Sequence, residues 1–481
     1  MLLASIALAS SAFSAHASAS PAYVVAVAKS VADDAEWRRV VDALVTKHGG
    51  ASAVPVVTFD AAHPESLVEP LSTLHPRHLA IVVPPAEAGR AFVGGVHRAA
   101  RRLDDDPYGD VRWGIVTAAS ADGALRLASH AEPLVMRRAA GTADFPMRLF
   151  DSSVWWSEEA AWSFTLHSSD APNRTLDEKS IGPAVAAALN ERPVDLVLSG
   201  GHATERGLEL GFRKPAGRIG PKDGRTVVEC ADHSVIPLAS PSPKAWIGVG
   251  NCLIGNVNGP SSAACSFVDD FGVRAHVGYV VVTWFGRGGW GTLSWFTDQP
   301  GRYTLNDAWF LNNQMIVDEL VRRWPQLADL KLADATFDGW IDDDPDRFGA
   351  AVARAVAGRV PQSELKDLVG LLWDRDAVSY IGDPAWDARL ATRDAGWTSR
   401  DDSSSGELRI EVRADADAHG VPPAFFPRQR IINPTLVAGA EFDPLVTDDF
   451  CIVRKASDLT NGATVDVRIA AGKERGASGA P

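Results

Sequence analysis

The sequence has little cysteine, and its arrangement suits neither a metal site nor a full set of disulfides. It contains four cysteines, Cys230, Cys252, Cys265 and Cys451, and no two of them form a Cys-x-x-Cys pair of the kind that binds zinc. Four cysteines allow three complete disulfide connectivities. If Cys252 is a catalytic thiol it must stay reduced, and the remaining three cysteines then cannot all pair.

Basic residues are also in deficit. The 481 residues include 47 Lys and Arg against 61 Asp and Glu, which gives a formal net charge of −14. A nucleic-acid-binding protein normally has a basic face that displaces counterions from phosphates, so we expect no nucleic-acid partner. Beyond the N-terminus no apolar run is long enough to cross a bilayer, so we expect no transmembrane segment.

The N-terminus consists of small and apolar residues from Met1 to about Ala15, followed by two small-residue cleavage patterns, Ala15–Ala17 and Ala17–Ala19. This composition predicts a signal peptide over residues 1–20, although the usual positive charges before the apolar stretch are missing. A disordered Ala/Ser tail is the alternative. With a signal peptide, the protein is expected to be secreted, periplasmic or attached to the cell surface.

Strands and helices alternate along the first part of the chain. The apolar runs Tyr23–Ala28, Val54–Phe59 and Leu79–Val83 predict buried strands, and the residues from Asp34 to Leu44 have helical periodicity. Alternation of this kind is typical of an α/β fold, in which helices cover both faces of a mostly parallel sheet.

Farther along, residues 276–284 predict a long strand, and residues 309–324 and 348–373 predict helices. The Ser-Ser-Ser-Gly segment 403–406 is typical of a linker. After it, apolar and polar residues alternate as in half-buried antiparallel strands, which predicts a small β-sandwich. We therefore expect a signal peptide over 1–20, an N-terminal α/β subdomain over 21–140, a catalytic subdomain over 141–400, and a β-sandwich over 401–481.

Two reactive side chains follow two of the predicted buried strands. His202 comes shortly after Val194–Leu198, and Cys252 comes directly after Trp246–Gly250. Ligands of open α/β sheets bind beyond the carboxyl ends of the strands. His202 and Cys252 are therefore placed where a site is expected.

These residue types suit nucleophilic attack on a carbonyl. The thiolate is the reactive form of cysteine, and a neighbouring imidazole can take its proton and later give it to the leaving amine. Backbone N–H groups in glycine-rich turns, here at Gly201 and Ala203, can stabilise the oxyanion. His202 precedes Cys252 by 50 positions. That order is typical of caspases, whereas papain-like enzymes have the cysteine first.

Several segments resemble the gingipains, a family of clan CD cysteine peptidases. The segment Ile247-Gly-Val-Gly-Asn-Cys-Leu-Ile-Gly-Asn256, followed by Ala264-Cys-Ser-Phe267, resembles that family's nucleophile segment. Gly201-His-Ala-Thr-Glu205 is similar to its Gly-His-Gly-x-Glu motif. Tyr380-Ile-Gly-Asp-Pro-Ala385 resembles the Gly-Asp-Pro that closes these domains before an immunoglobulin-like module, and 275–286 looks like the family's next strand.

The resemblance implies a caspase-like fold, peptide-bond hydrolysis of a protein or peptide substrate, and a substrate pocket near Trp284 and Tyr279. It implies structural calcium in related enzymes, while the chemistry itself requires no cofactor and no catalytic metal. The residue that orients His202 is not fixed by any motif, and Glu205 and Asp170 are the candidates. Ala203 stands where the family has glycine.

Two further departures concern the segment around Cys252. Asn256 stands where the family has aspartate, and the longer interval between His202 and Cys252 implies an insertion at about 213–243.

Simpler interpretations stay open for each of these residues. Cys252 alone is more often a buried, inert thiol, and His202 or Trp284 alone is more often a core residue. The acidic run Asp342-Asp-Asp344 resembles a cation-binding loop but is equally typical of a solvated loop. Two functional alternatives follow: a secreted scaffold or binding protein without activity, and an adhesion protein whose β-sandwich makes the contacts.

Overall fold

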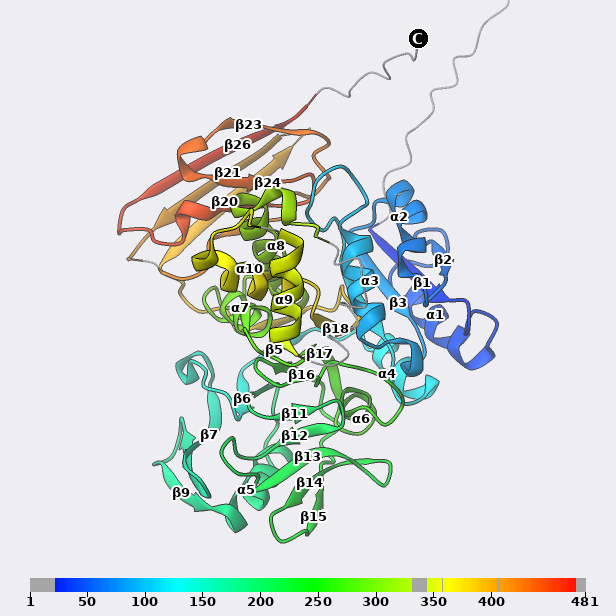
Figure 1. Cartoon of the computed structure of the whole chain (residues 1–481), viewed down its shortest axis with the longest axis vertical. Helices are drawn as coiled ribbons and strands as arrows, with labels where there is room; N and C mark the ends of the chain where they lie inside the picture. The colour runs from blue at the N-terminus through cyan, green and yellow to red at the C-terminus, as the bar shows by residue number, and fades with distance from the viewer. Residues whose placement is uncertain (1–21, 331–343, 357, 405–406, 418, 473–481) are drawn as a thin grey trace, which may run out of the picture.

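A twelve-stranded sheet runs through the centre of the molecule (Figure 1). The computed structural model describes residues 22–330, 344–356, 358–404, 407–417 and 419–472. The predicted signal peptide, the acidic residues Asp342 and Asp343, and the end of the predicted linker, Ser405 and Gly406, lie outside the described residues.

Neighbouring strands of this sheet pair in parallel except at β17–β18, β7–β8 and β8–β9. The sequence prediction of an α/β fold with a mostly parallel sheet is confirmed at this level. In spatial order, the strands are β2 (Val56–Phe59), β1 (Tyr23–Ala28), β3 (His78–Val82), β4 (Arg112–Val116), β18 (Val378–Gly382), β17 (Val273–Tyr279), β16 (Lys244–Gly248), β10 (Leu196–Ser199), β6 (Arg138–Gly141), β7 (Ser152–Ala160), β8 (Ser163–Ser168) and β9 (Arg174–Asp177).

Helices flank the sheet, and α1 illustrates why they form where they do. Asp34 accepts hydrogen bonds from the backbone N–H groups of Glu36 and Trp37, which caps the helix N-terminus. Trp37, Val40, Val41 and Leu44 are its buried residues, one stripe along the helix. The helices are α1 (Ala35–Lys47), α2 (Val68–Leu74), α3 (Arg90–Ala100), α4 (Ala121–Ser129), α5 (Glu178–Asn190), α6 (Ala263–Asp270), α7 (Arg287–Thr297), α8 (Leu305–Arg323), α9 (Pro345–Val356) and α10 (Gln362–Asp374).

A separate antiparallel sheet of five strands follows His202 and forms the lower part of Figure 1. It contains β11 (Ala203–Thr204), β12 (Gly207–Glu209), β13 (Gly217–Lys222), β14 (Arg225–Cys230) and β15 (Val235–Pro237). The insertion expected at about 213–243 therefore begins earlier, directly after His202. The apolar faces of β13 and β14 attach this sheet to the rest of the molecule. Ile219 and Val228 pack into one hydrophobic core with Ile181 of α5 and Trp246 of β16.

Two antiparallel sheets at the C-terminus share one hydrophobic core. Leu408, Ile410 and Val412 of one sheet pack with Phe425 and Cys451 of the other. This arrangement agrees with the predicted pairing of half-buried strands, and Ser403 and Ser404 belong to the first strand rather than to a linker. The first sheet contains β20 (Trp397–Ser404), β21 (Glu407–Ala414), β26 (Thr464–Ala471) and β23 (Pro434–Ala438), and the second β22 (Ala424–Phe425), β25 (Cys451–Val453) and β24 (Pro444–Val446).

Two sequence predictions of element length were wrong. The strand expected over 276–284 ends at Tyr279, because the following residues bond to other segments: Val280 N–H to the Ala377 carbonyl, and the Val282 carbonyl to the Trp373 indole. The helix expected over 348–373 is two helices, α9 and α10, and Pro361 precedes the first residue of α10. Proline cannot continue the helical hydrogen-bond ladder, so it separates them.

A buried cluster holds the segment after β18 against the first strand. The Asp383 carboxylate is 1% exposed, accepts a hydrogen bond from the Tyr23 hydroxyl at 2.8 Å and contacts Lys47 Nζ at 2.6 Å. His48 Nε2 lies 2.8 Å from the same carboxylate. Burial acts to raise the pKa of Asp383, but the His48 hydrogen bond and the Lys47 charge hold that pKa well below its usual range.

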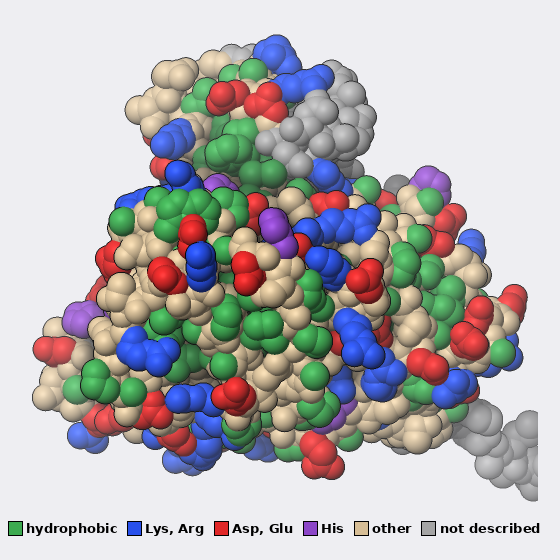
Figure 2. Space-filling view, turned by 90° about the horizontal axis from the view of Figure 1, so that it is seen from below, with side chains coloured by type: hydrophobic (Ala, Val, Ile, Leu, Met, Phe, Trp, Pro, Cys, Tyr) green, Lys and Arg blue, Asp and Glu red, His purple; other side chains and the backbone are tan. Residues whose placement is uncertain are grey.

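The surface seen from below carries both signs of charge. On the face shown in Figure 2, Lys and Arg side chains are interspersed with Asp and Glu, and neither sign gathers into a broad patch. Among the described helices, none combines the length and apolar character needed to cross a membrane.

We predict that Asp383→Asn lowers the free energy of unfolding by about 3–5 kcal/mol at neutral pH, because it leaves a buried cation without its partner. A carboxyl whose pKa is lowered in the folded state contributes stability above its unfolded pKa of about 3.9, and this contribution is lost as the pH falls below that value. Urea unfolding from neutral to acidic pH measures the difference, with exposed Asp387→Asn as the control. An equal deficit at all pH values would contradict the account.

Candidate active site

Cys252 and His202 follow neighbouring parallel strands of the large sheet. β10 and β16 pair in register from Leu196 with Ala245 to Ser199 with Gly248. The carboxyl ends of the two strands therefore lie side by side, and the loops that carry His202 and Cys252 leave the sheet at the same edge. Both residues follow strands, as the sequence indicated, and the structure adds that these two strands are neighbours.

A chain of buried hydrogen bonds ties the two loops together. The Asn251 side chain, 0% exposed, donates from Nδ2 to the Gly201 carbonyl at 3.0 Å. Its Oδ1 accepts from the Ser199 hydroxyl at 2.5 Å, and that hydroxyl oxygen accepts from the Trp246 indole N–H at 2.8 Å. Buried polar groups that are fully paired favour one arrangement of the loops. Asn251 therefore fixes the position of the residue before His202 relative to the residue before Cys252.

The turn that carries Cys252 is held by the segment that follows β17. Leu253 N–H donates to the Val281 carbonyl at 3.0 Å, and Thr283 N–H donates to Cys252 Sγ at 3.4 Å. Leu253 has φ of 59°, an unfavourable region for a residue with a side chain. Val281 and Thr283, which were predicted to belong to a strand over 276–284, therefore position the Cys252 thiol instead of extending the sheet.

Cys252 differs from the other three cysteines in its access to solvent. All four thiols are free, and Cys230, Cys265 and Cys451 are buried, whereas Cys252 is half-buried. Burial raises the pKa of Cys265 to about 12, and the negative charge of Asp269 makes a smaller contribution in the same direction. Burial likewise raises the pKa of Cys451 to about 12. Since a buried thiol in apolar surroundings is inert, Cys252 is the cysteine suited to react.

His202 is exposed, and its ring stacks on Phe212 with centroids 4.7 Å apart and an interplanar angle of 8°. Within the described part of the chain, no hydrogen bond joins its imidazole to the Cys252 thiol. Catalytic hydrogen bonds are often long or absent before substrate binds. Direct proton transfer between the two side chains would need the imidazole to come within hydrogen-bond distance of the thiol.

The backbone around His202 suits an oxyanion site. Gly201 has φ of 108°, where glycine is favoured, and an added Cβ would meet no atom within 4 Å. The Glu209 N–H donates to the His202 carbonyl, and the ladder pairs Ala203 with Leu208. Because hydrogen-bonded and non-hydrogen-bonded pairs alternate, the Ala203 N–H points away from β12, on the open side of the edge strand β11.

The two residues predicted to line the substrate pocket have different environments. Trp284 is 55% exposed. Tyr279 is 0% exposed; its hydroxyl donates to Asp374 at 3.4 Å and accepts from the Gly289 N–H at 2.9 Å. The pocket role of Tyr279 is therefore wrong for this structure, because the ring is in the core and supports the start of α7.

Two further residues near this edge were not predicted. Asp374 accepts hydrogen bonds from the backbone N–H groups of Arg287 and Gly288 at the start of α7, and burial raises its pKa to about 6. Trp290 of α7 is 44% exposed, and its Nε1 lies 3.7 Å from the position a Cβ would take on Gly250. The aromatic content of the sequence gave no means of distinguishing Trp290 from the buried tryptophans.

Neither candidate for orienting His202 contacts it. Glu205 lies 3.8 Å from the Arg206 guanidinium. Asp170 is exposed, accepts a hydrogen bond from Ser168 at 2.5 Å and pairs with Arg192 at 3.6 Å. In the described residues the structure does not bring Glu205 or Asp170 into hydrogen-bond contact with the imidazole.

Comparisons with known proteins do not identify a family for this chain. No family model and no curated protein matches the chain. Among solved structures, the chain is similar to one described as "Structure of Protease", with a TM-score of 0.38 and 10% sequence identity over 93% of this chain and 97% of that chain. A likeness this distant assigns neither a family nor a mechanism to this protein.

We predict that Asn251→Ala lowers the free energy of unfolding by about 1–3 kcal/mol, because the Ser199 hydroxyl and the Gly201 carbonyl lose a buried partner. Urea unfolding measures the change. Asn173→Ala, which changes an exposed asparagine before β9, is the control and should change stability by less than about 0.5 kcal/mol. Equal stability of the two variants would show that the link between the loops contributes nothing.

We also predict that iodoacetamide modifies Cys252 in the native protein, while Cys230, Cys265 and Cys451 react only after unfolding. Mass spectrometry of tryptic peptides before and after denaturation measures the extent at each site. Modification of Cys265 as fast as Cys252 in the native protein would contradict the burial pattern.

Proposed function

We propose that the protein is a cysteine peptidase in which Cys252 is the nucleophile and His202 the general base. The observation that carries this proposal is the placement of both residues in loops at the carboxyl ends of β16 and β10, joined by the Asn251–Gly201 hydrogen bond. The partial exposure of the Cys252 thiol and the hydrogen bond it accepts from Thr283 support the same role.

In the acylation step, His202 accepts the thiol proton and the Cys252 sulfur attacks the carbonyl carbon of a peptide bond. The carbonyl π electrons move to oxygen, and the N–H groups of Ala203 and Cys252 stabilise the resulting oxyanion. Collapse of this intermediate breaks the C–N bond, and the imidazolium gives its proton to the leaving amine. The product is a thioester between Cys252 and the acyl part of the substrate.

In the deacylation step, His202 takes a proton from water and the hydroxide attacks the thioester carbonyl. The C–S bond breaks, the acid product leaves, and the proton returns to the sulfur. No cofactor takes part in either step. The substrate is a protein or peptide, and the exposed side chains of Trp284, Trp290 and Phe212 provide apolar surface beside the two loops.

The proposal extends to the fold and the location of the protein. The α/β part is gingipain-like and caspase-like, the C-terminal sheets are immunoglobulin-like, and the protein is exported to the periplasm, the cell surface or the medium. Their support is the set of motifs around His202, Cys252 and Gly382 together with the N-terminal apolar segment.

The proposal predicts cleavage of a mixed peptide library by the purified protein, followed by mass spectrometry of the fragments. Cys252→Ala should abolish cleavage, and His202→Asn should lower its rate by about 10²–10⁴. His233→Asn is the matched control, since His233 is an exposed histidine in the turn between β14 and β15. Cleavage that persists in Cys252→Ala would sink the proposal.

A scaffold or binding protein without activity is the second candidate, and the His202 environment favours it. The imidazole stacks on Phe212, and Glu205 and Asp170 are engaged with other residues. The variant Phe212→Ala separates the two functions, because it frees the imidazole. Faster cleavage in this variant supports a peptidase with a mobile base, while folded protein that cleaves nothing with or without Phe212 supports the scaffold.

A further inference from the structure

The loop between β12 and β13 lies directly against His202. Residues 211–215 of this loop read Gly-Phe-Arg-Lys-Pro, and the side chains from Phe212 to Pro215 are exposed. The Phe212 ring stacks on the His202 imidazole with centroids 4.7 Å apart, although Phe212 is itself 64% exposed. The 211–215 loop therefore covers one face of the imidazole that the proposed mechanism uses.

Contacts to the end of β7 hold the 211–215 loop in this position. The Glu158 carboxylate accepts hydrogen bonds from the backbone N–H groups of Phe212 and Arg213, the latter at 2.7 Å. The Arg213 guanidinium donates to the Glu159 carbonyl at 2.5 Å. A hydrogen bond to a charged group is roughly twice as strong as one between neutral groups. Glu158 thus keeps the Phe212 backbone where its ring lies on the imidazole.

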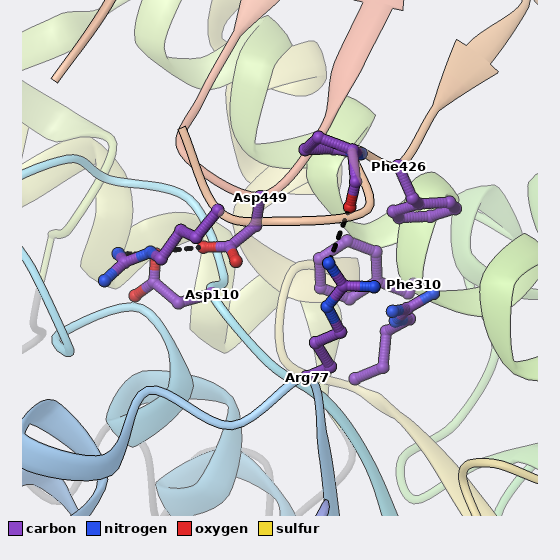
Figure 3. A pocket seen from close by; sticks show the side chains of 8 residues that line it. Arg77, Asp110, Phe310, Phe426 and Asp449 are labelled. Carbon is purple, nitrogen blue, oxygen red and sulfur yellow. Dashed lines mark hydrogen bonds and ion pairs between the residues drawn. The ribbon is translucent and has the colours of Figure 1, made fainter. Parts of the chain in front are cut away.

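The same loop has the features of a site for limited proteolysis. Peptidases cut folded proteins in exposed loops of this kind. A peptidase specific for basic residues can cut after Arg213, whereas Pro215 protects the bond that follows Lys214. By contrast, Arg77 is half-buried in the small pocket shown in Figure 3, where it donates to the Pro427 carbonyl at 2.8 Å.

We propose that the 211–215 loop restrains His202 in the intact chain, and that cleavage between Arg213 and Lys214 by a peptidase specific for basic residues releases it. The proposal rests on the proposed function, because it treats His202 as the base of Cys252. The loop would then keep the enzyme in a state of low activity until it is cut.

The chemistry of the cut explains the release. Water adds across the peptide bond and leaves a carboxylate on Arg213 and an ammonium group on Lys214. A chain-terminal carboxyl has a pKa of about 3.3–3.7, so the new group is negatively charged at neutral pH. It forms on the residue whose N–H binds the Glu158 carboxylate, and the two negative charges repel each other. Phe212 then loses the contact that holds it on His202.

The cut leaves the rest of the molecule assembled. β12 and β13 pair Leu208 with Ile219, and both side chains are buried in one hydrophobic core. At the base of the loop, the Leu210 N–H donates to the Gly217 carbonyl at 2.8 Å. Both new ends are therefore anchored, and the change is confined to the loop.

Brief digestion of the full chain with trypsin, stopped by a trypsin inhibitor, tests the cleavage site. Within residues 22–330 we expect the first cut after Arg213, identified by mass spectrometry, and Arg213→Gln should remove it. The turn between β13 and β14 is an internal control, because Lys222 and Arg225 pair directly across the ladder and should resist. An earlier cut elsewhere in 22–330 would overturn the assignment of the site.

The effect on His202 is measured as the rate at which iodoacetamide alkylates Cys252 at pH 6. Loss of an aromatic stack should make the cut chain react about two- to tenfold faster than the intact chain. This gain should be absent in cut His202→Asn and in trypsin-treated Arg213→Gln. Phe212→Ala should show the same gain without a cut, whereas Phe212→Tyr, which keeps a ring on the imidazole, should not.

The outcomes separate this proposal from the proposed function. Equal alkylation rates in the cut chain, the intact chain and Phe212→Ala would overturn the role of the loop, while peptide cleavage by the intact chain would still support a peptidase. A gain that requires His202 supports the role of the loop. If neither the intact nor the cut chain then cleaves peptides, the result contradicts the proposed function alone.

Discussion

The side chain of Asn251 is the contact on which the proposed chemistry depends. Parallel pairing of β10 and β16 brings two strand ends together, but loops that leave a sheet can take many paths. The hydrogen bond from Asn251 to the Gly201 carbonyl removes much of this freedom, and its second bond, to Ser199, joins both loops to the buried Trp246. These hydrogen bonds fix the backbone of both loops to the buried core. In the proposed mechanism only the His202 side chain then has to move.

The sequence was sufficient for the features that follow from local patterns. Buried strands such as Tyr23–Ala28 are continuous apolar runs, and α1 has both a cap and a regular apolar stripe, so the α/β fold could be predicted from period and composition. The location of Cys252 and His202 after strands followed from the same reasoning. The partial exposure of Cys252 among four cysteines agrees with the choice of nucleophile.

Features that depend on long-range packing could not be predicted. Tyr279 was placed near a pocket because the segment 275–286 resembles a strand of the gingipain family. In the structure β17 is buried on both faces, and the Tyr279 ring lies in the core, where its hydroxyl meets Asp374. The residues after Tyr279 read as a strand because they are apolar, but they bond to the Cys252 turn and α10 instead. The ion pairs of the acidic loop before β4 could not be predicted either. Asp104 pairs with Arg430, which lies more than three hundred residues later and also contacts Asp449.

The most direct test of the account is the rate at which iodoacetamide modifies Cys252 as a function of pH, compared between the unchanged chain and His202→Asn. If His202 serves as the base of Cys252, the rate stays high in the unchanged chain below about pH 7, where an ordinary cysteine has little thiolate. It should fall in His202→Asn to that of an ordinary exposed thiol. Identical pH profiles in the two proteins would contradict the pairing of Cys252 with His202 and leave the inactive scaffold as the better function.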